Sequence, residues 1–432
     1  MIKAYDAWKS IRLKHISKTI GQYGANLSAG NYLENGVRFL RTTDIQENGE
    51  IIVAEKGAYV EKSLVRDYLL EADDILFSRS GTLGRSYLHT DDTIGDFAFA
   101  GYLVRFRLNH LVHPKFIFYV SKSSGFSAQI EANAIQSTIS NFNGEKYGNI
   151  EILIPSLETQ KLIATFLDGK TATIDTFIAK KQRLIQLLEE KRTALINQAV
   201  TKGLNPHVPM KDSGIPWIGK IPEHWEVLPL KFLTTHITSG SRGWAQYYTE
   251  NGAIFLRITN LSRKSIELNL EDIQYIQPPS VSEGKRSHVQ LGDLLISITA
   301  YIGTVGVVSQ NLGEAYVNQH VALIRPNQDV VNPYWLGWCL FSSSGQNQFK
   351  RLLNGGTKDG LGLDDIKNLF VLIPPIDEQL IIVDRINHQV SVSINLVHKI
   401  SKQIEKLQEY RRSLITAAVT GKLNIKEVET NV

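Results

Sequence analysis

The chain has 432 residues, of which 43% are hydrophobic and 21% are charged, the balance of an ordinary globular protein with length for several packed domains. Its single cysteine, Cys339, excludes a disulfide scaffold and a cysteine-rich zinc module and fits a reducing compartment. The net charge of +4 argues only weakly for nucleic acid, because the excess of basic residues lies in two helical segments. No apolar run is long enough to cross a membrane and the first residues lack the apolar core of a signal peptide, so we expect a cytoplasmic protein.

The chain repeats itself. Shifting the sequence by 219 positions, so that Ile154 meets Ile373, superposes 154–205 on 373–424 without a gap. Weaker matches lie upstream, where 39–45 aligns with 255–261. The sequence therefore predicts two copies of a unit, each made of a large domain followed by a helical segment.

The order of segments follows from this repeat. In chain order we expect a mixed domain at 1–153, a helical segment at 154–205, a linker at 206–216, a second mixed domain at 217–372, a second helical segment at 373–425 and a disordered tail at 426–432.

The two large domains carry strand and turn signals. Short runs of Val, Ile, Phe and Tyr, for example 101–108 and 293–299, are separated by Gly, Asn, Asp and Ser. Pro114–Ser121 and Pro333–Phe341 are predicted to be short buried helices with proline in the first turn. Each domain is therefore predicted to be α+β.

The helical segments have apolar residues at alternating three- and four-residue steps, which is typical of a coiled-coil seam. The predicted seam consists of Ile174, Ile178, Ile185, Leu188 and Leu195 in the first segment and Val397, Ile404, Leu407 and Leu414 in the second. We expect the first helix to span 171–200, roughly 45 Å. The simplest partner for its apolar stripe is the second helical segment. The alternative is that each helix packs on its own domain.

Two arginines interrupt the seam at equivalent positions, Arg192 and Arg411. Glutamates lie close along each helix and are expected to compensate them. These glutamates are Glu189, Glu190, Glu405 and Glu409.

Motifs for catalysis are missing from the sequence. It contains no phosphate-binding GxxxxGK[ST] loop, no HExxH and no CxxC, and its 11 histidines are scattered. A duplicated layout also suits binding better than catalysis, so we expect a non-catalytic protein without a metal of its own.

The segment 212–227, DSGIPWIGKIPEHWEV, closely resembles the opening of each half of the specificity (S) subunits of Type I restriction-modification systems. Ile373-Pro374, Glu378-Gln379 and the helix ending in Ala-Val-Thr-Gly-Lys-Leu at 418–423 are similar to the helical region of that family. The resemblance covers the full chain. The first half departs from the pattern, because it lacks the Trp-Ile-Gly opening and has Thr159 where the second half has Glu378.

This resemblance implies a DNA-reading scaffold with two target recognition domains separated by an antiparallel pair of long helices. Each domain would read one half of a bipartite, asymmetric site in double-stranded DNA. Two methyltransferase subunits and two restriction subunits would join the chain. S-adenosylmethionine, ATP and Mg²⁺ would belong to those partners, with no cofactor in this chain.

Sequence-specific readout needs arginine and short polar side chains on loops. The candidates follow the aligned strands and lie in nearby polar loops. In the first domain they are Arg41, Thr42, Thr43, Arg79, Ser80, Thr82, Arg85, Ser140, Asn141, Asn143 and Lys146. In the second domain they are Arg257, Thr259, Asn260, Ser297, Thr299, Tyr301, Gln319, His320, Thr357 and Lys358.

Two other classes of function stay open at this point. A coiled-coil assembly scaffold without DNA contact would explain the helices, but not two large, diverged, loop-rich domains. A self-contained nuclease would need a clustered set of carboxylates and lysine, which the sequence does not indicate.

Overall fold

The computed structural model describes residues 8–19, 21–52, 57–134, 141–240, 242–278, 284–354 and 360–425. The predicted tail at 426–432 lies outside these ranges. The chain forms two compact units, of which the first joins the beginning and the end of the chain and the second is one continuous segment. Unit 1 is Met1–Lys181 with Ser401–Val432, and unit 2 is Gln182–Ile400.

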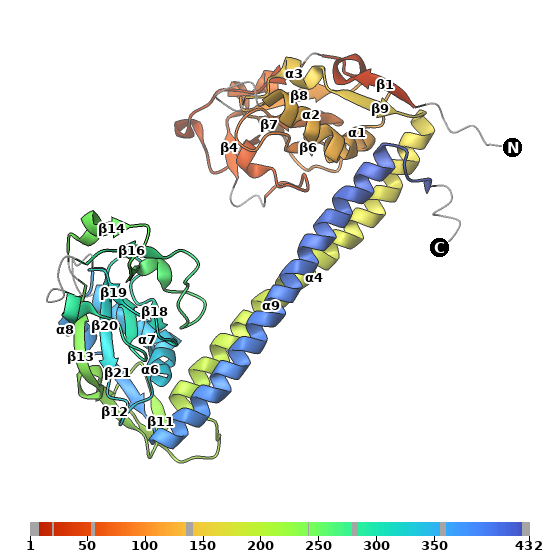
Figure 1. The fold of residues 1–432 in the computed structure, drawn as a ribbon. Helices are drawn as coiled ribbons and strands as arrows, with labels where there is room; N and C mark the ends of the chain where they lie inside the picture. Colours follow the sequence, from red (N-terminus) through yellow and green to blue (C-terminus); the bar gives the residue numbers. More distant parts are fainter. Residues whose placement is uncertain are drawn as a thin grey trace. The chain divides into compact units, whose positions relative to one another are not determined.

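Unit 1 contains the first mixed domain, drawn in red to yellow in Figure 1. Its strands form a four-stranded sheet in the order β2-β8-β5-β6, a three-stranded sheet in the order β4-β3-β7, and the pair β1-β9. The strands are β1 (Lys9–Arg12), β2 (Gln22–Tyr23), β3 (Val37–Leu40), β4 (Ala58–Val60), β5 (Asp74–Ser78), β6 (Ser86–Leu88), β7 (Phe97–Phe99), β8 (Leu103–Arg107) and β9 (Glu151–Ile154). The helices are α1 (Pro114–Ser121), α2 (Ser124–Ala134) and α3 (Gly144–Gly148).

Unit 2 repeats this plan. Its four-stranded sheets have the orders β13-β20-β17-β18 and β14-β16-β15-β19, and β12 pairs with β21 as β1 pairs with β9. The strands are β12 (Glu226–Pro229), β13 (Thr234–Ser239), β14 (Tyr248–Thr249), β15 (Ala253–Leu256), β16 (Gln274–Ile276), β17 (Leu294–Ser297), β18 (Val305–Val307), β19 (Ala315–Val317), β20 (Val321–Pro326) and β21 (Phe370–Ile373). The helices are α6 (Pro333–Phe341), α7 (Ser343–Asn354) and α8 (Leu363–Lys367). The prediction of α1 and α6 is confirmed residue for residue.

The predicted linker at 206–216 is not free of regular structure. Strand β10 (Met210–Asp212) lies within it and pairs with β11 (Lys220–Pro222) in an antiparallel hairpin. Before this hairpin, the long helix stops where Gly203 adopts a left-handed conformation with φ 72°.

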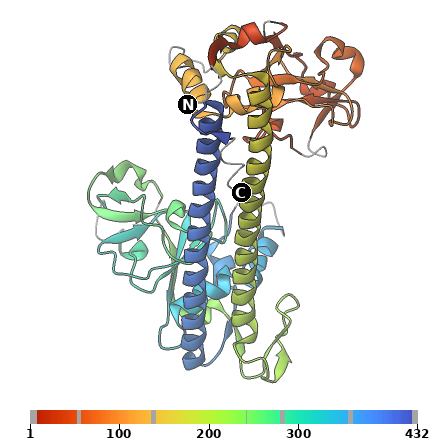
Figure 2. The ribbon, with the colours of Figure 1, turned by 90° about the vertical axis from the view of Figure 1, so that its right-hand side faces the viewer.

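The long helices are α4 (Leu157–Lys202) and α9 (Ile376–Val419). In unit 1 the first part of α4 lies beside the last part of α9, and in unit 2 the last part of α4 lies beside the first part of α9 (Figures 1 and 2). The predicted start of α4 at residue 171 is wrong, because its first turns pack into the domain that precedes them, where Ile163 and Leu167 are buried. With 46 residues, α4 is about 69 Å long.

The ends of the long helices complete the cores of both domains. In unit 1, Ala418 and Val419 at the end of α9 belong to the same buried cluster as Phe116 of α1. In unit 2, Ala199 and Val200 at the end of α4 belong to the same cluster as Trp335 of α6. Each domain is therefore stabilised by the helix that follows it and by the end of the other long helix.

A buried glutamine at the start of each long helix repeats one hydrogen-bond pattern. In unit 1 the Gln160 side chain accepts a hydrogen bond from the His113 backbone N–H at 2.8 Å, just before α1. In unit 2 the Gln379 side chain accepts one from the Asn332 N–H at 2.9 Å, just before α6. The two copies of the repeat therefore share this hydrogen bond as well as their sequence.

The predicted seam residues line the facing sides of the helices to different degrees. Ile174 is buried, and most of the others are partly buried. Leu195 is 38% exposed, because its neighbour Ile196 takes the buried position in the core of unit 2. The partly buried residues are Ile178, Ile185, Leu188, Val397, Ile404, Leu407 and Leu414.

The expected compensation of the two seam arginines by nearby glutamates is wrong. Arg411 instead binds Asp175 on the facing helix through two hydrogen bonds, of 2.9 and 3.1 Å. The repeat places Ile394 at the position equivalent to Asp175, so this position offers no carboxylate to Arg192. The Arg192 Nε is buried and has no hydrogen-bond partner among the residues described.

Candidate nucleic-acid interface

Three loops of the first domain meet at one edge of its sheets. Strands β3 and β7 are parallel and end level with each other, at Leu40 and Phe99. Strand β5 ends at Ser78, opposite the first residue of the antiparallel β8. The loops 41–44, 79–85 and 100–102 therefore emerge together, and we call them the loop edge of the first domain. The Arg79 backbone N–H donates to the Tyr102 carbonyl at 2.9 Å, which ties two of these loops.

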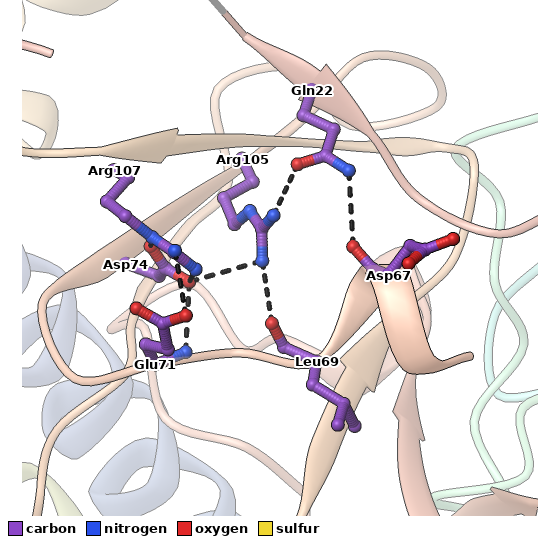
Figure 3. Close-up of polar contacts among 7 residues, drawn as sticks. All are labelled: Gln22, Asp67, Leu69, Glu71, Asp74, Arg105 and Arg107. Atoms are coloured by element: carbon purple, nitrogen blue, oxygen red, sulfur yellow. Dashed lines mark hydrogen bonds and ion pairs between the residues drawn. The ribbon is translucent and has the colours of Figure 1, made fainter. Parts of the chain in front are cut away.

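A buried carboxylate holds the strands that carry this edge. Asp74 at the start of β5 is fully buried and accepts hydrogen bonds of 2.8 and 3.0 Å from Arg107 on β8, and one of 3.4 Å from Arg105 (Figure 3). Arg105 also donates to the Leu69 carbonyl at 2.7 Å and to the Gln22 side chain. The hydrogen bond with Asp74 raises the pKa of Arg107, while burial lowers the pKa of Arg105.

The second domain has the same anchor in a simpler form. Asp293, which directly precedes β17, is buried and accepts hydrogen bonds of 2.8 and 2.7 Å from Arg325 on β20. A single arginine thus binds the buried aspartate in the second domain, whereas two arginines bind it in the first.

Two of the predicted DNA-binding arginines are held by the fold. Arg41 donates hydrogen bonds of 3.0 and 2.8 Å to the buried Asp44, which raises the pKa of Arg41. Arg85 Nη1 donates to the Ile45 carbonyl at 3.1 Å, and its Nε is buried. These guanidinium groups serve mainly to fix the loop edge. Between them lie the half-buried Thr42 and the exposed Thr43.

Arg79 is positioned differently. Its guanidinium stacks over the Tyr23 ring at 4.5 Å, and its Nε donates to the Asn141 side chain at 3.3 Å. Ser80 is half-buried and Thr82 is exposed in the same loop. The structure therefore brings Arg79 and Asn141, which lie in distant parts of the sequence, to one place.

Two of the predicted residues in and after the polar loop before α3 make contacts that stabilise the fold. The Asn143 side chain caps α3 by accepting a hydrogen bond from the Lys146 N–H at 2.9 Å. Lys146 Nζ donates to the Asn133 carbonyl at 3.2 Å. The candidates Ser140, Thr357 and Lys358 lie outside the described residues.

In the second domain, burial corrects two predictions. Asn260 is 1% exposed, and its side chain accepts a hydrogen bond from the Arg257 N–H at 2.9 Å. Ser297 is fully buried, and its hydroxyl donates to the Tyr301 carbonyl. Neither side chain has surface for DNA, so both leave the candidate set. Thr259, in the loop that Asn260 holds, is exposed.

The remaining candidates of the second domain lie at the equivalent edge, where β15, β17 and β19 end. Tyr301 is 64% exposed and stacks with Arg263 at 4.5 Å. His320 contacts the Thr299 hydroxyl and the Gln319 amide, both at 3.1 Å. Arg257 is only loosely paired, at 3.4 Å from the exposed Asp272.

Three aromatic or basic residues of these edges escaped the sequence prediction. Tyr23, Tyr102 and Arg263 each contact or neighbour a predicted residue, and Tyr102 is 66% exposed. Tyr102 directly precedes β8, in the turn that aligns with His320 of the repeat, and that alignment could have identified it.

Within the described ranges, no group of three or more His, Cys, Asp or Glu side chains is arranged to hold a metal ion. In the same part of the chain, no helix has the length and apolar character to cross a membrane.

Comparison with known families decides the family of this chain. The family model of the Type I restriction modification DNA specificity domain matches residues 5–189 and 259–406. The chain belongs to this specificity family. The resemblance predicted from the sequence is therefore confirmed.

Relatives within the specificity family span nearly the whole chain. The EcoBI specificity subunit of Escherichia coli is 21% identical over 98% of this chain and 88% of the relative. The EcoKI specificity subunit of Escherichia coli K12 is 26% identical over 91% of this chain and 84% of the relative.

Solved structures share the fold of the specificity family. A chain from a study of complex assembly and conformational transition of the type I R-M system matches with a TM-score of 0.73 at 15% identity, over 98% of this chain and 100% of that chain. The HsdS subunit from Thermoanaerobacter tengcongensis matches with a TM-score of 0.51 at 16% identity, over 96% and 97%. The predicted α+β fold with two similar domains and long paired helices is thus confirmed.

Proposed function

We propose that this specificity-family chain reads a bipartite, asymmetric site in double-stranded DNA, with one domain on each half. The observation that carries the proposal is the repeat of one loop edge with different side chains. Arg79 of the first edge is replaced by the buried Ile298 of the second, and Tyr102 by His320. Two similar folds that present different donors and acceptors are suited to two different base sequences.

The chemistry of both edges fits readout rather than catalysis. Each edge combines an arginine stacked on a tyrosine with amide and hydroxyl side chains. Such groups bind base edges and phosphates without breaking bonds. We therefore propose that this chain is a non-catalytic subunit acting in the cytoplasm, and that S-adenosylmethionine, ATP and Mg²⁺ belong to its partners.

We further propose that two methyltransferase subunits dock on the paired helices and that two restriction subunits join them. A groove of about 620 Å³ between the helices of unit 2 supports this. It is lined by leucines and valines, by the basic residues Lys191, Arg192 and Arg385, and by no acidic residue. An apolar partner segment with a carboxylate would fit this lining and would supply the partner that Arg192 lacks.

Replacing Arg192 with leucine tests this docking surface. The stability of the free chain is expected to stay the same or rise slightly, because the buried Arg192 Nε makes no hydrogen bond to any residue that the structure describes. Binding of the methyltransferase subunit is expected to weaken on the order of tenfold. Titration calorimetry and thermal unfolding measure the two effects separately. As the matched control, Arg411→Leu should destabilise the chain itself, because it leaves Asp175 alone. Unchanged affinity of Arg192→Leu would contradict the docking surface.

Methylome sequencing of cells that carry this chain and its partner methyltransferase tests the reading function. The expected result is one methylated motif with two specific parts and an unspecified gap. A motif without a gap would contradict reading by two domains. Absence of any sequence preference would favour the assembly scaffold without DNA contact.

A further inference from the structure

The backbone of Arg79 is held on both sides at the loop edge of the first domain. Its N–H donates to the Tyr102 carbonyl at 2.9 Å, and its own carbonyl accepts from the Phe142 N–H at 2.9 Å. Phe142 is fully buried in the core of this domain. The Cα of Arg79 is therefore fixed relative to the packed core.

The side chain of Arg79 is held as well. Tyr23 supports the flat face of the guanidinium at 4.5 Å, and the Asn141 oxygen accepts from its Nε at 3.3 Å. The Tyr23 hydroxyl in turn accepts a hydrogen bond of 3.1 Å from the Gly144 N–H at the start of α3. These contacts use the face and the Nε, and leave Nη1 and Nη2 without a partner in the described ranges.

This arrangement distinguishes Arg79 from four other arginines in and beside these sheets. Arg41 is neutralised by Asp44, and Arg105 and Arg107 by Asp74. Arg85 donates to backbone carbonyls. Among these five, only Arg79 has neither a carboxylate nor a backbone carbonyl as acceptor in the part of the chain that the structure describes, and its one hydrogen bond goes to the Asn141 side chain.

We propose that Arg79 reads one guanine of the half-site bound by the first domain, with Tyr23 and Asn141 as its positioning residues. The inference rests on the proposed DNA-reading function. Two parallel N–H donors match the O6 and N7 acceptors of guanine in the major groove, the commonest specific contact that arginine makes. A side chain fixed before binding loses little rotamer entropy in forming this pair. The second domain has the buried Ile298 at this position, so its half-site is read by other groups.

The test uses the chain assembled with its methyltransferase subunits. Methylome sequencing of the wild type first returns the two half-sites. With Arg79→Gln, one base pair of one half-site is expected to lose its discrimination by about 5- to 150-fold, while the other half-site stays unchanged. Tyr23→Ala and Asn141→Ala should relax the same base pair to a smaller degree. Arg12→Gln is the matched control, because Arg12 lies on β1 in an exposed pair with Glu151 and should leave the motif unchanged.

A probe on the DNA side makes the result independent of how well the variants fold. Duplexes with 7-deazaguanine at that position lack N7, and the wild-type complex should bind them more weakly, whereas Arg79→Gln should not distinguish them from guanine. An unchanged motif for Arg79→Gln, or equal loss of affinity on all duplexes with a smaller salt dependence, would overturn guanine reading; the second result would indicate a phosphate contact. A wild-type complex that methylates no bipartite motif would instead refute the proposed function itself.

Discussion

Replacing Asp74 with alanine is expected to destabilise unit 1 by about 3–5 kcal/mol. Asp74 is fully buried, and the side chains of Arg105 and Arg107 are only 9% and 23% exposed. Removing the carboxylate leaves Arg105 without its acidic partner and leaves Arg107 with only the exposed Glu71, 2.8 Å away. Water cannot replace the Asp74 carboxylate fully, because the packed strands β5 and β8 cover the position.

The midpoint of urea-induced unfolding measures this loss, together with hydrogen exchange of the β5 amides to assign it to unit 1. The matched control is Asp96→Ala in the same unit. Asp96 pairs with Lys62 at 2.6 Å, but both side chains are more than half exposed, so the expected cost is about 0–1 kcal/mol. Similar shifts for the two variants would show that the buried network does not anchor the loop edge.

Local sequence patterns are sufficient to define the short buried helices but not the long ones. Helices α1 and α6 were predictable to the residue, because a proline fixes the first turn and the following residues are apolar. The start of α4 was not, because its turns before residue 171, which include Gly169, are held by packing on the preceding domain, where Ile163 and Leu167 are buried. In the structure a Cβ at Gly169 would meet open space, and the helix passes through it.

The position of the candidate site could be predicted from the sequence, but the residues available for binding could not. Strand ends followed by polar residues indicate a loop edge, and both edges form where the repeat aligns them. Which arginines remain available depends on contacts between distant residues. Arg85 reaches the carbonyl of Ile45, and Arg79 meets Asn141, and no spacing in the sequence encodes either contact.

The error at Arg192 has a similar cause. Glutamates along the same helix gave a plausible local compensation, but Arg411 reaches across to Asp175 on the facing helix. Only the pairing of α4 with α9 shows that Ile394 takes the place of Asp175 for Arg192. The Arg411–Asp175 contact therefore has no counterpart at Arg192, and this difference between the two copies points to the groove around Arg192 as a docking surface.

Lengthening both long helices by one heptad is expected to lengthen the gap between the two half-sites without changing either half-site. The change duplicates residues 175–181 of α4 together with residues 405–411 of α9, which face them in unit 1 through the Asp175–Arg411 pair. Seven residues keep the seam in register and add about 10.5 Å, which corresponds to at most about three base pairs. Methylome sequencing reads the new gap directly, with each specific part as an internal control.

Duplicating only one of the two heptads is the matched control. It shifts one helix against the other by seven residues. The hydrogen bond of 2.7 Å from Lys181 Nζ to the Gln403 side-chain oxygen and the other contacts between the helices then cannot all form at once. This variant should lose recognition rather than shift the gap, because the domains are packed on the ends of both helices and cannot follow one of them alone. If the doubly lengthened chain still methylates the original site with the original gap, the helices do not set the spacing. The two loop edges would then have to reach their half-sites by some other part of the chain.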